Sequence, residues 1–183
     1  MEKKRIGIIA GSLRRDSYNK KVAVFLTGAL AERFDTKILD IARLALYNAD
    51  LDNETDMPQE WRQFRQDVKA LDAVLFVTPE YNRSMSAALK NALDVASRPM
   101  SENAWRGKPG GVVSVASGKM GGFGANHHLR QTAVCLNIKM MAHPEAYIGG
   151  ISDLIDADGV IDKDTQEFLE KFAGGFADWV DKF

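Results

Sequence analysis

Continuous apolar stretches alternate with amphipathic helical patterns along this chain, and this alternation restricts the fold more than any other feature. The stretch at Arg5–Ala10 reads RIGIIA, and the stretch at Ala73–Thr78 reads AVLFVT. Neither alternates apolar with polar residues, so both predict strands that are covered on both faces of a sheet. The strand starts recur roughly every 30 residues, a spacing that suits right-handed βαβ units.

The remaining pattern extends this arrangement along the whole chain. Further strands are predicted at Thr36–Ile41, Gly111–Ser117 and Lys139–His143. Apolar residues at helical spacing predict helices around Val22–Leu30, from Pro58 to Leu71, and over Met85–Ser97, Phe123–Leu136 and Thr165–Val180. We therefore predict an α/β fold: a flavodoxin-like, doubly wound sheet of five parallel strands with helices on both faces, formed by a single domain over residues 1–183.

The composition narrows the classes of function. The net charge is -1, from 24 basic and 25 acidic residues, so there is no basic excess of the kind that nucleic-acid binding needs. Cys135 is the only cysteine, which excludes an internal disulfide and a cysteine-ligated iron–sulfur cluster. Its apolar neighbours predict a core position. The apolar run Ile6–Ala10 is too short for a signal peptide or a membrane span. We expect a cytoplasmic protein without nucleic-acid or membrane partners.

Three unusual loops follow the first, third and fourth predicted strands. They read GSLRRDSYN (Gly11–Asn19), PEYNRS (Pro79–Ser84) and SGKMGGFG (Ser117–Gly124). In a doubly wound sheet, ligands bind beyond the carboxyl ends of the strands. Strands 1, 3 and 4 are neighbours in the flavodoxin-like order, so the three loops should converge on one crevice.

The first loop has the residues of an anion site. Ser12, Ser17 and Asn19 can donate hydrogen bonds to phosphate oxygens, and Arg14 adds a positive charge. The N–H groups at the start of the following helix add further donors. The loop matches neither G-x-G-x-x-G nor the P-loop motif. An ordinary helix N-cap surrounded by polar surface residues explains the composition of this loop equally well, since Asp16 and Ser17 are both good caps.

The other two loops are informative mainly in combination. Pro79 and Asn82 suit a tight turn, and Tyr81 offers a flat surface to a planar ring. An ordinary turn with a buried tyrosine is the alternative. The glycines of Ser117–Gly124 allow close approach of backbone to a ligand, although a mobile surface loop has the same composition.

Other candidate sites are weaker. His127 and His128 are adjacent, so on a helix they point about 100° apart and make a poor metal pair. The acidic stretch near Asp50 to Asp56 lacks the spacing of a calcium loop and predicts a solvated loop.

Taken together, the motifs resemble the NADPH-dependent FMN reductase family, and within it the bacterial quinone and chromate reductases. The resemblance rests on GSLRRDSYN, on TPEYNRSMSAALKNALD (Thr78–Asp94) and on SGKMGG, and continues through HHLRQ (His127–Gln131) and HPEAYIGG (His143–Gly150). It implies bound FMN, NADPH or NADH as electron donor, a small-molecule acceptor, and a homodimer or homotetramer. The acceptor would be a quinone or a similar compound such as chromate, an azo compound or free flavin.

The resemblance also implies which residues bind the cofactor. These are Ser12, Arg14, Ser17, Tyr18 and Asn19 in the first loop, Pro79, Glu80, Tyr81 and Asn82 against the isoalloxazine ring, and Ser117 and Gly118 near its pyrimidine edge. Flavin supplies the covalent chemistry, so no side chain is assigned as acid, base, nucleophile or metal ligand. Two positions depart from the family pattern. Asp16 stands where a small residue is common, and Arg83 where an aromatic is common, which would favour anionic substrates or the phosphates of NADPH.

Three hypotheses of function follow. The first is an FMN-dependent oxidoreductase in which NAD(P)H and the acceptor take turns at one site. The second is a flavodoxin-type electron carrier that docks protein partners, but such carriers need a strongly acidic surface, and the net charge is only -1. The third is a reductase that releases reduced FMN.

Overall fold

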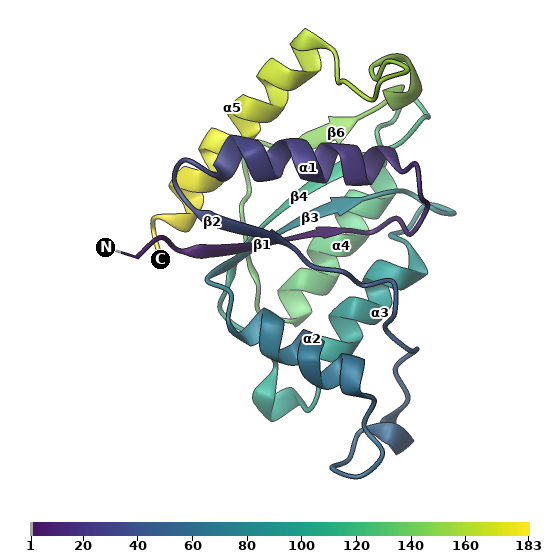
Figure 1. The fold of residues 1–183 in the computed structure, drawn as a ribbon, viewed down its shortest axis with the longest axis vertical. Helices are drawn as coiled ribbons and strands as arrows, with labels where there is room; N and C mark the ends of the chain where they lie inside the picture. The colour runs from purple at the N-terminus through teal and green to yellow at the C-terminus, as the bar shows by residue number, and fades with distance from the viewer. Residues whose placement is uncertain (1) are drawn as a thin grey trace.

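The computed structural model describes residues 2–183, which form a parallel sheet between two layers of helices (Figure 1). The strands are β1 (Arg5–Ala10), β2 (Asp35–Ile38), β3 (Ala73–Thr78), β4 (Pro109–Val115), β5 (Lys139–Met140) and β6 (Ala146–Ile148). Their order is β2-β1-β3-β4-β5, with β6 also pairing with β4, and the pairings are parallel. This is the flavodoxin-like strand order, so the predicted fold class is confirmed.

The fifth position of the sheet differs from the prediction. β5 pairs with the start of β4, where Pro109 faces Lys139, and β6 pairs with its end, where Val113 faces Ala146. The strand predicted at Lys139–His143 is therefore shorter than predicted, and a second short strand, β6, which was not predicted, follows after residues 141–145. Pro144 lies in that gap, and its missing N–H cannot join a ladder.

Helices cover both faces of the sheet. They are α1 (Tyr18–Leu30), α2 (Gln59–Lys69), α3 (Ala87–Ala96), α4 (Phe123–Cys135) and α5 (Lys163–Val180), with short 3₁₀ helices at Ala49–Leu51, Met100–Glu102 and Ile151–Asp153. α1 and α5 lie on one face, and α2, α3 and α4 on the other (Figure 1). Successive residues of β1 point into different cores. Ile8 belongs to the buried cluster that contains Leu26 and Phe172, whereas Ile9 belongs to the cluster that contains Trp61 and Phe76. Full burial of each such side chain contributes about 1.5–3 kcal/mol.

Side-chain caps decide where several helices begin. Ser17 Oγ accepts a hydrogen bond from Lys20 N–H at 3.4 Å, and Ser86 Oγ accepts one from Leu89 N–H at 3.2 Å. Each cap satisfies a backbone donor that the first turn leaves free. α3 therefore begins at Ala87, two residues later than the hydrophobic pattern predicts.

One prediction about burial is wrong, and a second needs one exception. Cys135, predicted to be in the core, is exposed at the end of α4, and the buried residues of this region are Leu136 and Ile138, which follow the helix. The acidic stretch from Asp50 to Asp56 is exposed as predicted, except that the Asp52 side chain is only 10% exposed and pairs with Arg65.

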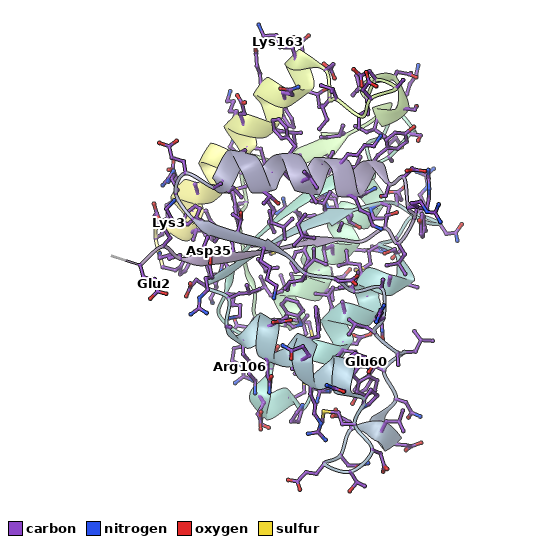
Figure 2. All side chains as sticks on the ribbon, in the orientation of Figure 1. Glu2, Lys3, Asp35, Glu60, Arg106 and Lys163 are labelled. Atoms are coloured by element: carbon purple, nitrogen blue, oxygen red, sulfur yellow. The ribbon has the colours of Figure 1, made fainter. Side chains whose placement is uncertain are left out.

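The periphery is charged, as Lys3, Arg106 and Lys163 illustrate (Figure 2). None of the helices in residues 2–183 has the length and apolar character to cross a membrane.

Candidate functional site

The carboxyl ends of β1, β3 and β4 lie side by side, with Ala10 in register with Val77 and Thr78 with Ser114. The loops that leave these ends enclose a cavity of about 340 Å³, within the range of small-molecule pockets. The cavity is lined by Ser12, Arg14, Ser17, Tyr18, Asn19, Pro79, Glu80, Tyr81, Val115, Ala116, Ser117, Gly118 and Ile151. Of the residues predicted as cofactor-binding, Asn82 alone lies outside it.

Gly11 lets the first two loops approach each other. Its N–H donates to the Val77 carbonyl at 2.8 Å, and its own carbonyl accepts a hydrogen bond from Ser86 Oγ at 2.5 Å. A Cβ at this position would lie 3.0 Å from Pro79 Cδ and 3.2 Å from Leu89 Cδ2. The glycine is therefore required by the close contact between the loops.

One end of the cavity is polar and buried. Ser12, Ser17 and Asn19 are only 3%, 2% and 5% exposed. The Asn19 Oδ1 atom has no hydrogen-bond partner in residues 2–183, and an unpaired buried polar atom is costly. Ser17 caps α1, so the positive N-terminal end of that helix also faces this region. This end is suited to a ligand that carries an anion and hydrogen-bonding groups.

The two arginines of the first loop lie in different places. Arg14 lines the cavity, and its Nη2 donates to the Asp16 carbonyl at 3.3 Å. Arg15 instead lines a separate depression together with Asp16, Lys20 and Lys21. The exposed Asp16 side chain is not the cap of α1, since Ser17 is.

The second loop contains a tight turn. Tyr81 N–H donates to the Ser84 carbonyl at 2.9 Å, and Ser84 N–H donates back at 3.0 Å. Asn82 and Arg83 have φ of 51° and 67°, the left-handed pair of a type I′ turn. Tyr81 is 48% exposed, so the alternative of a buried tyrosine is wrong. Asn82 faces a neighbouring cavity of about 590 Å³, which Tyr81 also lines.

Glu80 ties this loop to α4. Its Oε2 accepts a hydrogen bond from Ala125 N–H at 3.0 Å, at the helix N-terminus, where a negative charge is stabilising. Its Oε1 lies 3.5 Å from Arg83 Nη1. A Cβ on Gly124 would meet the Arg83 carbonyl oxygen at 2.7 Å, so the two loops pack closely.

The glycines of the third loop have distinct roles. Gly121 and Gly122 have φ of 60° and 75°, which side-chain-bearing residues adopt reluctantly. A Cβ on Gly118, by contrast, would have no atom within 4 Å. Gly118 therefore borders open space in the cavity.

The two adjacent histidines contact different partners. His128 Nδ1 lies 3.0 Å from Ser84 Oγ, and His127 Nε2 lies 3.2 Å from the Tyr147 hydroxyl. That hydroxyl donates to Glu145 Oε1 at 2.8 Å. Burial, followed by this hydrogen bond, raises the pKa of Tyr147 to about 12, so the phenol is protonated at neutral pH.

Sequence reasoning missed Val115, Ala116 and Ile151. The first two lie directly before the predicted loop. Ile151 arrives from a distant segment, and its N–H donates to the Ala116 carbonyl at 3.3 Å. No local motif marks it.

The strand order and the position of the cavity define the class: a flavodoxin-like α/β protein with its ligand site at the ends of β1, β3 and β4. A family model for NADPH-dependent FMN reductases matches residues 4–153. The chain belongs to that family.

Several similar proteins with assigned names support this family assignment. The chain is 49% identical over 175 residues to a quinone reductase from Pseudomonas putida, covering 96% of this chain and 94% of the relative. It is 42% identical over 177 residues to a 2-hydroxy-1,4-benzoquinone reductase from a Burkholderia species, covering 96% of each. The solved structure of a flavoenzyme NAD(P)H:(acceptor) oxidoreductase from Paracoccus denitrificans superimposes with a TM-score of 0.90 at 37% identity, over 98% of both chains. These matches favour an oxidoreductase over an electron carrier.

Proposed function

We propose that this protein is an FMN-dependent oxidoreductase that transfers two electrons from NAD(P)H to quinones or similar small-molecule acceptors. The observation that supports it most is a single cavity that combines a buried polar end with a half-exposed aromatic end. Ten of the eleven residues that the family resemblance assigns to the cofactor line this cavity.

The polar end would hold the phosphate of FMN. The hydroxyls of Ser12 and Ser17 and the amide of Asn19 would hydrogen-bond it, with the N-terminus of α1 and the Arg14 guanidinium balancing its charge. The unpaired Asn19 Oδ1 is an acceptor, so the phosphate would not satisfy it; it would need a donor such as a hydroxyl of the ribityl chain of FMN, while the Asn19 NH₂ group could donate to the phosphate.

The other end would hold the flavin ring. Pro79, Tyr81 and the Ser117–Gly118 backbone would bound it, and Glu80 fixes the second loop against α4. When bound, FMN accepts a hydride from NAD(P)H and gives two electrons to the acceptor. The side chains position the reactants and exclude water. None is assigned as acid, base or nucleophile.

We further propose that NAD(P)H and the acceptor use one opening in turn. Hydride transfer requires contact at about 3–3.5 Å, and a ring packed on the protein leaves one face for approach. Reciprocal rate plotted against reciprocal NAD(P)H at several quinone concentrations should then give parallel lines. Intersecting lines, with a demonstrable ternary complex, would contradict a shared site.

The decisive experiment is purification followed by absorbance spectroscopy and a quinone-dependent NAD(P)H oxidation assay. We expect flavin bands that persist through gel filtration, and turnover only when both donor and quinone are present. A colourless protein that takes up no FMN would contradict the proposal. Loss of flavin on the column would instead indicate a reductase that releases reduced FMN. The homodimer or homotetramer and the cytoplasmic location stay predictions, to be tested by ultracentrifugation and by cell fractionation.

A further inference from the structure

Arg83 presents a weakly balanced positive charge beside the cavity. Its side chain is 75% exposed, and Nη1 lies 3.5 Å from Glu80 Oε1 and 3.6 Å from Met120 Sδ. The contact with Glu80 is at the outer limit of hydrogen bonding, and the thioether sulfur of Met120 is a weak acceptor. The Glu80 carboxylate is already engaged, since its second oxygen accepts the Ala125 N–H at 3.0 Å. The guanidinium is thus free to bind a further anion.

The turn itself does not require an arginine. Arg83 occupies the second left-handed position of the type I′ turn, with φ of 67°, where glycine is preferred. Its backbone is held by the contact with α4 that Gly124 permits. A large charged residue therefore stands where the local conformation disfavours any side chain, and its guanidinium makes no strong contact that would stabilise the fold.

The position of Arg83 is close to where a substrate would approach. Tyr81, two residues earlier, lines both the candidate FMN cavity and the adjacent 590 Å³ cavity. Met120, which Arg83 contacts, belongs to the third loop and follows Lys119, an exposed residue without an ion pair in residues 2–183. The guanidinium thus joins the second and third loops. Arg83 itself lines neither cavity, but its neighbours Asn82 and Ser84 line the 590 Å³ cavity, and Glu80 is the charged group that it contacts.

We propose that Arg83 is a specificity-determining residue that favours anionic electron acceptors, namely quinones with an ionised hydroxyl, carboxylate or sulfonate group. This inference rests on the proposed function. The net reaction is unchanged: NAD(P)H loses a hydride, and the quinone gains two electrons and two protons, one of them from solvent. Arg83 exchanges no proton and binds only the negative charge of the acceptor.

The test compares a charged and a neutral acceptor of similar shape, 1,2-naphthoquinone-4-sulfonate and 1,2-naphthoquinone, with the FMN-loaded enzyme. We expect Arg83→Gln to lower kcat/KM for the sulfonate by roughly three- to tenfold and to change the neutral quinone by less than about twofold. Arg83→Lys should restore most of the preference. The matched control Arg15→Gln removes the same charge from the neighbouring depression and should leave the ratio unchanged.

Two readouts do not depend on turnover. Calorimetric binding of naphthalene-1-sulfonate, which cannot be reduced, should weaken in Arg83→Gln but not in Arg15→Gln. Rising ionic strength should reduce the sulfonate preference of the wild type, because an exposed ion pair is screened by salt.

Several results would overturn the inference. Equal losses for both quinones would assign Arg83 a structural role in the turn. If Arg83→Gln raised the KM for NADPH and left the ratio of kcat/KM for the two quinones unchanged, Arg83 would bind NADPH and not the acceptor. If wild type and Arg83→Gln reduce the two quinones with the same ratio of kcat/KM, the inference about Arg83 is wrong but the proposed function is unaffected. A wild type that binds FMN but reduces neither quinone overturns this inference and the proposed function together.

Discussion

Two buried polar clusters in this protein differ in whether their hydrogen bonds are complete. In the first, the Arg65 guanidinium donates to both Asp52 carboxylate oxygens at 2.8 and 3.0 Å, and its Nε donates to the Val95 carbonyl at 2.8 Å. The Tyr47 hydroxyl donates to Asp52 Oδ2 at 3.1 Å. The Arg65 and Asp52 side chains are only 9% and 10% exposed, so this network replaces water almost entirely.

The second cluster is the polar end of the candidate site. Ser12, Ser17 and Asn19 are at least as buried, yet Asn19 Oδ1 has no partner in the described chain. The cluster also borders an open cavity, whereas the Asp52–Arg65 network joins the segment before α2 to the end of α3. The first cluster therefore completes the fold, whereas the second would be completed by the cofactor of the proposed function. Mutations in the two should affect different measurements.

The largest effect is expected at Asp52. Replacing it in Asp52→Ala leaves the Arg65 charge buried without its partner, which should lower the free energy of unfolding by about 3–5 kcal/mol. Urea denaturation measures this loss. FMN affinity of the folded variant should stay within about twofold of wild type. A loss below about 1 kcal/mol would mean that the pair behaves as an exposed ion pair.

The Asp52 contribution also has a pH signature. The Arg65 guanidinium is the main cause that holds the pKa of the Asp52 carboxyl below its ordinary value of 3.8. A carboxyl with a lowered folded-state pKa stabilises the fold above its unfolded pKa, and this contribution is lost as pH falls through the folded value. The stability gap between wild type and Asp52→Ala should thus be constant from neutral pH to about 5 and shrink below about 4. A gap that shrinks between pH 7 and 5 would contradict this assignment.

Gly118→Val should weaken FMN binding without lowering stability, which is the opposite of what we expect for Asp52→Ala. A Cβ at Gly118 meets no atom within 4 Å, so the folded protein should retain its stability and circular dichroism. The added methyl groups would occupy space assigned to the flavin and should weaken FMN binding by roughly a hundredfold or more. Gly118→Ala, which adds one carbon, should have a smaller effect. Near-normal FMN content in the valine variant would show that this loop does not contact the flavin.

The Arg14→Ala variant tests the charge at the polar end. A hydrogen bond to a charged group contributes about 1.5–3 kcal/mol, so FMN affinity should fall roughly ten- to a hundredfold. Arg15→Ala is the control, because Arg15 lines a different depression. Titration of apo-protein with FMN measures both. Equal effects at the two arginines would show that the loop is misassigned.

The sequence predicted which residues line the cavity better than it predicted burial. Ser12, Arg14, Pro79 and Ser117 each follow a strand closely, and parallel strands bring their carboxyl ends to one edge, so local patterns were sufficient to unite them. Asp52 has no such signal, because a polar stretch does not reveal that one carboxylate will meet an arginine on the following helix.

Helix orientation and long-range paths account for the other errors. Ala125, Leu129 and Ala133 repeat at intervals of four on the buried face of α4, and Cys135 lies off that face despite its apolar neighbours. Ile151 reaches the cavity only because the chain that leaves β6 passes beside the end of β4. That path depends on the split of the sheet edge beside β4 into the two short strands β5 and β6.

The smallest effect is expected at Asn19. It is also the sharpest test of the difference between the Asp52–Arg65 network and the polar end of the cavity. Asn19→Ala removes a buried acceptor that lacks a partner, so the apo-protein should keep its free energy of unfolding or gain slightly, whereas losing a paired group would destabilise it. FMN affinity should fall by roughly two- to tenfold, the contribution of an ordinary hydrogen bond. Asn19→Asp keeps an acceptor but adds a negative charge near the proposed phosphate, so it should bind FMN more weakly than the alanine variant. Denaturation of the apo-proteins and FMN titration measure the two quantities separately. If Asn19→Ala destabilised the apo-protein by more than about 1 kcal/mol and left FMN affinity unchanged, this amide would belong to the fold, as Asp52 does.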